Sequence, residues 1–304
     1  FLFTYSKAVI RKFLKLLFGN VFIDWNVITG SFDDELNLIN TNVIKNNSNS
    51  YFADPFIIDI NDKVYIFVEE FFWQSNIGKI SLIELNGFKI KYHGIILEED
   101  FHLSFPFVFN HNNVTYMIPE SHQNTNVSLY ESIENPLEWK LKGNIISDIC
   151  TSDTVIFPYK KSLFALTNNE SGRFGDRLTN LSLHKSNTMS WQQLPQFEFM
   201  TTISTEATKS RNGGLFKWKD NYYRVNQLPA FNIYGKSVTV NKIYVNTRND
   251  KISYHEEETS EFKNILVGIS EKYLGCHHLH VNEKYKLFVC DVSSLKFNRL
   301  IMHK

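Results

Sequence analysis

The segment Ala53-Asp54-Pro55-Phe56-Ile57 leads into an apolar run that is typical of a β-strand, and four further segments lead into strands in the same way. They are Ser104-Phe105-Pro106-Phe107-Val108, Ser152-Asp153-Thr154-Val155-Ile156, Asn212-Gly213-Gly214-Leu215-Phe216 and His277-His278-Leu279-His280-Val281. With Asp54, Phe105, Asp153, Gly213 and His277 as matching positions, the intervals between them are 51, 48, 60 and 64 residues. Repeats of this length are typical of a propeller or an array, and each is long enough for a four-stranded sheet.

Turn residues divide these intervals into short strands. In the first interval, Asn61-Asp62 and Asn86-Gly87 separate apolar runs, which predicts strands at 55–60, 63–69, 79–85 and 89–97. The same pattern in the third interval predicts its last strand at 191–197. The first strands of each interval are the more apolar ones, as expected where neighbouring blades cover the inner strands of a propeller.

The last interval is one strand short, with predicted strands only at 279–281, 286–290 and 299–303. The segment Ile23-Asp24-Trp25-Asn26-Val27-Ile28 is a spare strand near the N-terminus. Its addition to the last sheet would close the ring and cover an open sheet edge. We therefore expect an all-β fold, in which residues 23–304 form a five-bladed β-propeller closed by an N-terminal strand.

The composition agrees with one large all-β domain. Lys plus Arg (32) balance Asp plus Glu (32), which argues against a nucleic-acid partner, and the hydrophobic content of 43% argues against disorder. The chain has three cysteines, an odd number that is too small for a disulfide framework. A reducing compartment is favoured, so we expect a cytoplasmic protein. No run of 18 apolar residues predicts a transmembrane helix.

Residues 1–22 differ from the rest of the chain. Lys7, Arg11 and Lys15 recur at four-residue spacing among apolar side chains, which predicts a short basic amphipathic helix. One interpretation is a linker that packs on the propeller or joins it to an upstream catalytic domain. The other is a helix that binds an anionic membrane surface, which would make the protein membrane-associated. The chain starts at Phe1 rather than Met, which favours a fragment or a processed product.

A propeller gathers the starts of its innermost strands around one axis, so distant residues become neighbours. At the mouth of the channel we expect polar side chains from several blades, namely Asp54, His102, Ser104, Asp153, Arg211 and a histidine of the last blade. This histidine is either His277 or His278, and we assign His278. Side chains at the ends of the second strands are expected to form a further ring, to which we assign Glu120. Blade one contributes either Glu69 or Glu70 to this ring, and we assign Glu70. Burying charges is costly unless they are paired or functional, so this set indicates a site.

Structural explanations exist for the individual residues. An Asp before a Pro, as at Asp54, is common in turns, and Gly213-Gly214 can supply positive φ angles. The shared position of Asp54 and Asp153 within the repeat is the stronger argument for function. The nearby histidines resemble a zinc site, but only His278 and His280 share a strand face. We therefore expect no metal and no other cofactor.

The motifs resemble a known group of proteins. Ala53-Asp54-Pro55-Phe56-Ile57-Ile58 followed by Lys63-Val64-Tyr65-Ile66-Phe67 resembles the first blade of the family-43 arabinofuranosidases and xylosidases. Phe52-Ala53-Asp54-Pro55-Phe56, Phe105-Pro106-Phe107-Val108, Tyr116-Met117-Ile118-Pro119-Glu120-Ser121 and Gly213-Gly214-Leu215-Phe216 are more similar to the glycosidase-like N-terminal domain of the glucosamine inositolphosphorylceramide transferases and its bacterial relatives. The resemblance covers about residues 25–304.

This resemblance implies roles for several residues. In the family-43 pattern, one Asp is the general base, a second Asp orients, and a Glu is the general acid. Asp54 matches the base and Asp153 the second Asp. The family's Glu-Gly-Pro-His-Leu motif aligns with Arg211-Asn212-Gly213-Gly214-Leu215, and an arginine cannot donate a proton at neutral pH. Glu120 and Glu206 are then the alternative acids.

Two functions stay open. The first is a carbohydrate-active enzyme that acts on a glycosidic bond of a furanoside or an acidic sugar in surface-glycan metabolism, with Arg211 and His278 holding the substrate. An arginine among carboxylates suits a phosphate or a sugar acid, so the substrate would be a glycan or a glycosyl phosphate. The alternative is a noncatalytic glycan-binding module that serves a separate glycosyltransferase domain.

Overall fold

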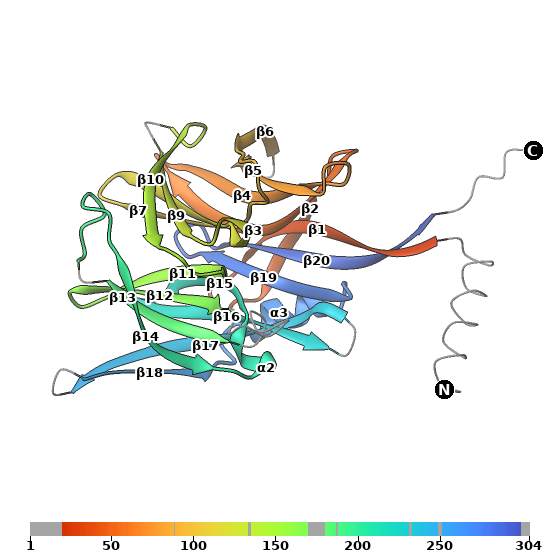
Figure 1. Cartoon of the computed structure of the whole chain (residues 1–304). Helices are drawn as coiled ribbons and strands as arrows, with labels where there is room; N and C mark the ends of the chain where they lie inside the picture. The colour runs from red at the N-terminus through yellow and green to blue at the C-terminus, as the bar shows by residue number, and fades with distance from the viewer. Residues whose placement is uncertain are drawn as a thin grey trace, which may run out of the picture.

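The computed structural model describes residues 20–298 except 88, 133–134, 170–179, 187, 231–232 and 249–250. These residues form five antiparallel sheets of four strands each (Figure 1). The innermost strands of neighbouring sheets contact one another around a common axis. The predicted fold class, an all-β five-bladed propeller, is confirmed.

Four blades follow one another along the chain. Blade one contains β3 (Ser50–Ile60), β4 (Lys63–Phe72), β5 (Ile77–Asn86) and β6 (Lys89–Leu97). Blade two contains β7 (Ser104–His111), β8 (Val114–Glu120), β9 (Val127–Ser132) and β10 (Trp139–Ile146), with the 3-10 turn η1 (His122–Asn124) between β8 and β9. Blade three contains β11 (Thr151–Tyr159), β12 (Ser162–Asn169), β13 (Leu181–Ser186) and β14 (Phe197–Ser204). After the short helix α2 (Ala207–Ser210), blade four contains β15 (Asn212–Trp218), β16 (Asn221–Ala230), β17 (Ile233–Arg248) and β18 (Lys251–Glu258).

The fifth blade joins both ends of the described chain. Its strands are β19 (Gly275–Asn282), β20 (Leu287–Asn298), β1 (Asn20–Phe32) and β2 (Leu38–Ile44), in that order. The N-terminal part of the chain therefore supplies two strands to this blade, where the sequence predicted one. The second strand, β2, was missed because its half-exposed run Leu-Ile-Asn-Thr-Asn-Val-Ile carries polar residues at its centre, as a solvated outer strand does.

Two further predictions concern the ends of the chain. The strand predicted at 299–303 lies outside the described residues, and β1 occupies the third position of the fifth blade. Residues 20–22, which were included in the basic helix, begin β1 instead. The remainder of that predicted helix, residues 1–19, also lies outside the described part of the chain.

The outermost strand of blade three is β14, which begins at Phe197. The sequence predicted this strand at residues 191–197, and that prediction was wrong. Pro195 lies within the predicted run and has no N–H for a sheet ladder. Trp191 is buried and packs between blades, with its ring centroid 4.7 Å from that of Phe109 and 5.6 Å from that of Tyr116. Its apolar side chain therefore fills a contact with blade two and does not belong to a strand.

Each innermost strand carries the same irregularity near its start. The register slips by one residue between Ala53 and Phe56, Ser104 and Phe107, Ser152 and Val155, Asn212 and Leu215, and Cys276 and His278. These one-residue β-bulges coincide with the five repeated segments of the sequence. Bulges redirect side chains and are frequent next to active sites. The repeat therefore marks five bulges at one end of the propeller axis.

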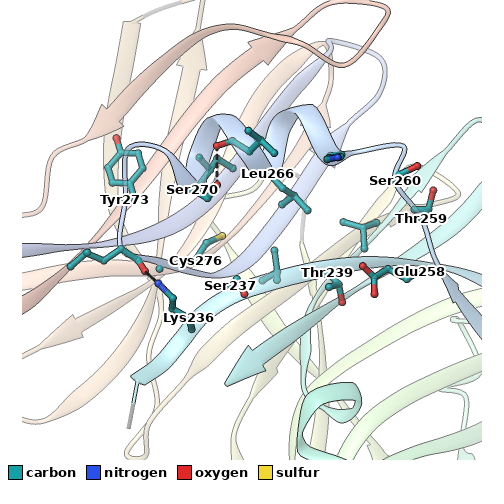
Figure 2. A pocket seen from close by; sticks show the side chains of 17 residues that line it. Lys236, Ser237, Thr239, Glu258, Thr259, Ser260, Leu266, Ser270, Tyr273 and Cys276 are labelled. Atoms are coloured by element: carbon teal, nitrogen blue, oxygen red, sulfur yellow. Dashed lines mark hydrogen bonds between the residues drawn. The ribbon is translucent and has the colours of Figure 1, made fainter. Parts of the chain in front are cut away.

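Helix α3 (Lys263–Ser270) connects blades four and five and covers a groove of about 640 Å³ against β17 (Figure 2). Apolar side chains from both elements line it, among them Val238, Val240, Leu266 and Ile269. None of the predicted site residues belongs to its lining, so the groove is separate from the bulges. In the described part of the chain, no helix combines the length and the apolar character that crossing a membrane requires.

The fifth blade provides a test of the fold. Ile28 on β1 is fully buried beside the side chains of β19 and β20, whereas Ile39 on β2 is 64% exposed. We expect Ile28→Ala to lower the free energy of unfolding by about 2 to 5 kcal/mol, because it leaves a cavity in the closing blade. Ile39→Ala is the matched control and should change it by less than about 0.5 kcal/mol. Urea unfolding measures both, and equal effects would contradict this strand arrangement.

Candidate functional site

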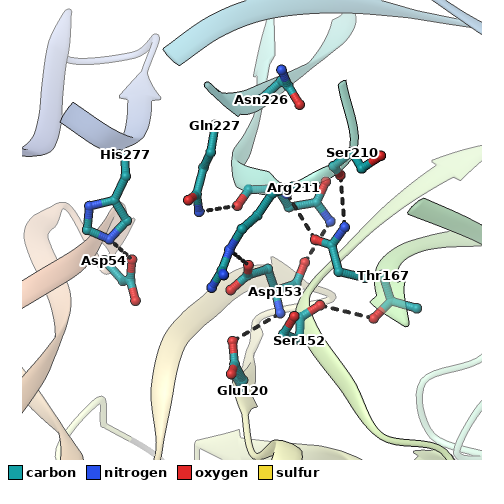
Figure 3. A network of polar contacts seen from close by, with 12 residues as sticks. Asp54, Glu120, Ser152, Asp153, Thr167, Ser210, Arg211, Asn226, Gln227 and His277 are labelled. Carbon is teal, nitrogen blue, oxygen red and sulfur yellow. Dashed lines mark hydrogen bonds and ion pairs between the residues drawn. The ribbon is translucent and has the colours of Figure 1, made fainter. Parts of the chain in front are cut away.

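The side chains of Asp54 and His277 meet where blades one and five adjoin (Figure 3). His277 Nε2 lies 3.1 Å from Asp54 Oδ1 and 3.1 Å from Oδ2 of Asp291 on β20. The ring of Trp25 packs edge-on against the His277 ring, with 4.5 Å between centroids. The imidazole is thus fixed between two carboxylates and an indole.

Asp291 is fully buried and anchors this arrangement. Its carboxylate accepts hydrogen bonds from the backbone N–H of Asp54 at 3.1 Å, of His277 at 3.1 Å and of His278 at 2.9 Å. These bonds tie the bulges of the first and last blades together. Asp291 was not among the predicted site residues, although it is the one acidic residue in the apolar run Leu287-Phe288-Val289-Cys290-Asp291-Val292.

The neighbours of these groups set their charges. Burial alone would raise the pKa of Asp54, but the hydrogen bond and charge of His277 outweigh it and lower that pKa to about 2. Burial would lower the pKa of His277, but Asp291 and Asp54 raise it above its ordinary value. Burial raises the pKa of Asp291 to about 6, against the opposing effect of His277. Near neutral pH, Asp54 is therefore ionised and His277 carries the positive charge.

A second group faces this one from blades two, three and four. Arg211 Nε donates a hydrogen bond to Asp153 Oδ2 at 2.8 Å, and the backbone N–H of Asp153 donates to Glu120 Oε2 at 3.2 Å (Figure 3). Asp153 is only 2% exposed, and this burial raises its pKa well above the ordinary value. Arg211 opposes the shift, whereas the Glu120 carboxylate adds to it. Asp153 therefore holds its proton to a higher pH than an ordinary aspartate does.

Amide side chains fix the backbone around Arg211. Asn168 accepts a hydrogen bond from the backbone N–H of Asn212 at 3.0 Å and donates one to the carbonyl of Ser210 at 2.9 Å. Asn212 Nδ2 donates to the carbonyl of Asp153 at 2.7 Å, and Gln227 donates to the carbonyl of Asn212 at 2.6 Å. The residues on both sides of Arg211 are thus held in place, which preorganises its guanidinium.

Glu69 and His102 complete the cluster. His102 Nε2 lies 3.3 Å from Glu69 Oε1, and Nδ1 of the same ring accepts a hydrogen bond from the backbone N–H of Gly78 at 2.9 Å. Burial raises the pKa of Glu69 well above its ordinary value, and the charges of Asp54 and Glu120 add to the shift. Glu69 is thus a second carboxyl group with a raised pKa, and it lies next to Asp54, whose pKa is lowered.

Glu70 was predicted at this position, but its side chain lies elsewhere. Side chains alternate along β4, so Glu69 and Glu70 lie on opposite faces of blade one. The Glu70 carboxylate is buried within its own blade, where it accepts hydrogen bonds from Ser50, Ser81 and Tyr92 at 2.5 to 2.6 Å. Glu70 therefore stabilises blade one and does not join the central cluster.

Two more predicted site residues lie outside the cluster. The His278 ring is fully buried and packs edge-on against Phe56 at 4.5 Å and Phe105 at 5.4 Å, and burial lowers its pKa well below the ordinary value. It is a neutral core residue, and His277 takes the predicted place. Glu206 is exposed at the start of α2 and pairs with Lys209 at 2.9 Å.

The remaining predicted residues lie where the bulges converge. Asp54, Asp153, Arg211, Glu120 and His102 make the contacts described above. Ser104 is buried at the start of β7, opposite Glu120 in the strand register.

The first group also has the donor atoms of a small metal site. Ligand atoms of Asp54, His277 and Asp291 all lie within 4.8 Å of one another. A cation bound there would replace the proton through which His277 Nε2 contacts the two carboxylates.

The charge of His277 can be tested directly. Asp54→Asn removes one of its two carboxylate partners, so we expect the pKa of His277 to fall. In the wild type, the pKa of His277 is raised, so its ion pairs stabilise the fold at pH values below its ordinary pKa of 6.5. This stabilisation is lost as the pH rises through the pKa that His277 has in the folded state. Imidazole NMR titration measures the shift. An unchanged His277 pKa in Asp54→Asn would contradict the assignment.

Comparisons with known proteins agree with this fold. Residues 38–291 match the family described as glucosamine inositolphosphorylceramide transferase 1, N-terminal. The glucosamine inositolphosphorylceramide transferase 1 of Arabidopsis thaliana is 29% identical over 264 residues, which cover 83% of this chain and 34% of the relative. The protein of the same name from Oryza sativa subsp. japonica is 28% identical over 241 residues, which cover 76% of this chain and 32% of the relative.

Solved structures share the fold at low sequence identity. A thermostable family-43 glycoside hydrolase aligns with a TM-score of 0.54 and 14% identity, over 83% of this chain and 91% of the hydrolase. The α-L-arabinofuranosidase PaAbf62A from Podospora anserina aligns with a TM-score of 0.53 and 12% identity, over 83% and 93%. The chain spans about a third of the plant relatives that it matches. On the match to residues 38–291, the chain belongs to the family of glucosamine inositolphosphorylceramide transferase N-terminal domains.

Proposed function

We propose that this chain is a carbohydrate-active propeller domain that acts on a glycosidic bond in surface-glycan metabolism. The observation that carries the proposal is a cluster of buried carboxyl groups whose pKa values are shifted in opposite directions. Asp54 has a pKa lowered to about 2, whereas burial raises the pKa of Asp153 and of Glu69 well above their ordinary values. Pairs of carboxyl groups whose pKa values are driven apart are the mark of acid–base assignments.

Cleavage or formation of a glycosidic bond needs one ionised and one protonated carboxyl group on different sides of the sugar. Asp54 comes from blade one and Asp153 from blade three, and Arg211 contacts Asp153 (Figure 3). In our proposal, Asp54 accepts the proton of the attacking water or hydroxyl group. Asp153, with Glu120 beside it, donates a proton to the leaving oxygen.

Arg211 gives the proposed site a preference for an anionic group. Its guanidinium keeps its charge at any physiological pH, and it stands where the resemblance to the glycosidases would place a proton-donating Glu. A guanidinium forms strong two-pronged hydrogen bonds with phosphate or carboxylate. The names of the plant relatives include an inositol phosphoryl group, which fits a phosphate at this position. We propose a glycosyl phosphate or an acidic glycan as the substrate class.

The relatives are about three times as long as the matched part, so a separate glycosyltransferase domain is the partner that we propose. The same length difference favours one alternative, a noncatalytic propeller that binds glycan for that domain. A cytoplasmic location and a membrane contact through residues 1–22 stay predictions.

Asp54→Asn separates the two functions. We expect the variant to lose turnover by a factor of about 10² to 10⁴, because the general base is gone, and to keep most of its glycan binding. The assay is a screen of aryl furanosides and polysaccharide fragments with detection of products. Glu206→Gln is the matched control, since that carboxylate is exposed outside the cluster, and it should leave turnover unchanged.

Two results would contradict the proposed enzymatic function. One is full turnover in Asp54→Asn. The other is wild-type protein that binds glycan fragments without turning any of them over, which would leave the binding module as the function.

A further inference from the structure

Three aromatic side chains form a strip on blade one, and we call Tyr51, Phe71 and Trp73 the aromatic strip. Tyr51 lies opposite Phe71 in the register of β3 and β4, with 5.2 Å between ring centroids. The rings of Tyr51 and Trp73 are 6.4 Å apart at an angle of 38°, and Trp73 is 52% exposed. The strip therefore ends in an indole ring that is open to solvent.

The strip continues directly from the acid cluster. Glu69 and Phe71 lie on the same face of β4, since they are two residues apart, and Trp73 follows just beyond the strand. The Phe71 ring is also 5.9 Å from the ring of His102, which contacts Glu69. Burial raises the pKa of the Tyr51 hydroxyl, and the charges of Glu69, Asp54 and Asp291 add to the shift. A molecule bound at the carboxylates could thus extend along these rings.

The chemistry of the strip suits a sugar ring. Tyrosine and tryptophan have a large apolar face and a polar edge, so they are suited to sites where one side of a ligand is apolar and the other is hydrated. A sugar ring presents such an apolar face through its C–H groups. A row of three rings beside a proton-transfer cluster therefore fits a saccharide that continues from it.

We propose that the aromatic strip is a second sugar subsite, which holds an uncharged sugar ring linked to the unit at the acid cluster. The substrate would then contain at least two sugar units and would extend outward over blade one. This inference rests on the proposed function, because it takes the molecule at the cluster to be a glycan.

The test compares monosaccharides with disaccharides of the same sugar. The probes are methyl arabinofuranoside with α-1,5-arabinobiose, and N-acetylglucosamine with its β-1,4-linked disaccharide, titrated by calorimetry. We expect wild-type protein to bind at least one disaccharide more tightly than its monosaccharide. Trp73→Ala should weaken the binding of that disaccharide by up to about tenfold and leave the binding of the monosaccharide unchanged, since the indole ring would contact only the second sugar unit.

Two variants serve as controls. Trp73→Phe keeps an aromatic face and should retain most of the preference for the disaccharide. Phe199→Ala removes another exposed ring, 59% accessible on β14 of blade three, and should change neither affinity. Binding of the disaccharide should also survive Asp54→Asn, so that a loss of turnover and a loss of the subsite are separate results.

Several outcomes would overturn the subsite. One is a wild-type protein that binds neither disaccharide better than its monosaccharide. Another is a Trp73→Ala variant that keeps the full preference. A third is a dimer of the wild type in sedimentation that Trp73→Ala dissociates while glycan binding stays the same, because the strip would then contact a second copy of the chain.

Discussion

The buried carboxylate of Asp291 makes the interaction on which the site depends. It accepts hydrogen bonds from three backbone N–H groups, two in blade five and one in blade one. These blades meet where the ring closes, so the same carboxylate joins the first innermost strand to the last. It also lies 3.1 Å from His277 Nε2 and so fixes the imidazole that keeps Asp54 ionised. Closure of the propeller and the charge of the site are linked through this one residue.

The site is costly to maintain, which favours a functional explanation. Asp54 and Asp153 have φ angles of 47° and 52°, in the left-handed region that non-glycine residues seldom adopt. Such backbone positions cost about 1 to 3 kcal/mol each and occur mainly where function requires them. Both residues are also buried acids, and each is held by a cation, His277 for Asp54 and Arg211 for Asp153. Stability alone would favour apolar residues at these positions.

The sequence predicted much of this site because the bulges repeat. Asp54 and Asp153 occupy matching positions, so the fivefold repeat was enough to bring them together. The predictions were wrong where two adjacent residues were candidates, because Glu70 was chosen over Glu69 and His278 over His277. Adjacent residues on a strand face opposite ways, and a one-residue bulge reverses which of them faces the site. Asp291 lies on the second strand of its blade and has no counterpart in the repeat, so only its isolated charge in an apolar run could have revealed it.

The central claim is that the cluster holds an ionised Asp54 and a protonated Asp153 at the same pH. Carboxyl ¹³C NMR titration of aspartate-labelled protein tests it, with Asp54→Asn and Asp153→Asn to assign the two signals. We predict that Asp54 stays ionised down to about pH 2, whereas Asp153 takes up its proton at a pH well above its ordinary pKa of 3.8. Two carboxyl groups that both titrate near 3.8 would contradict the account.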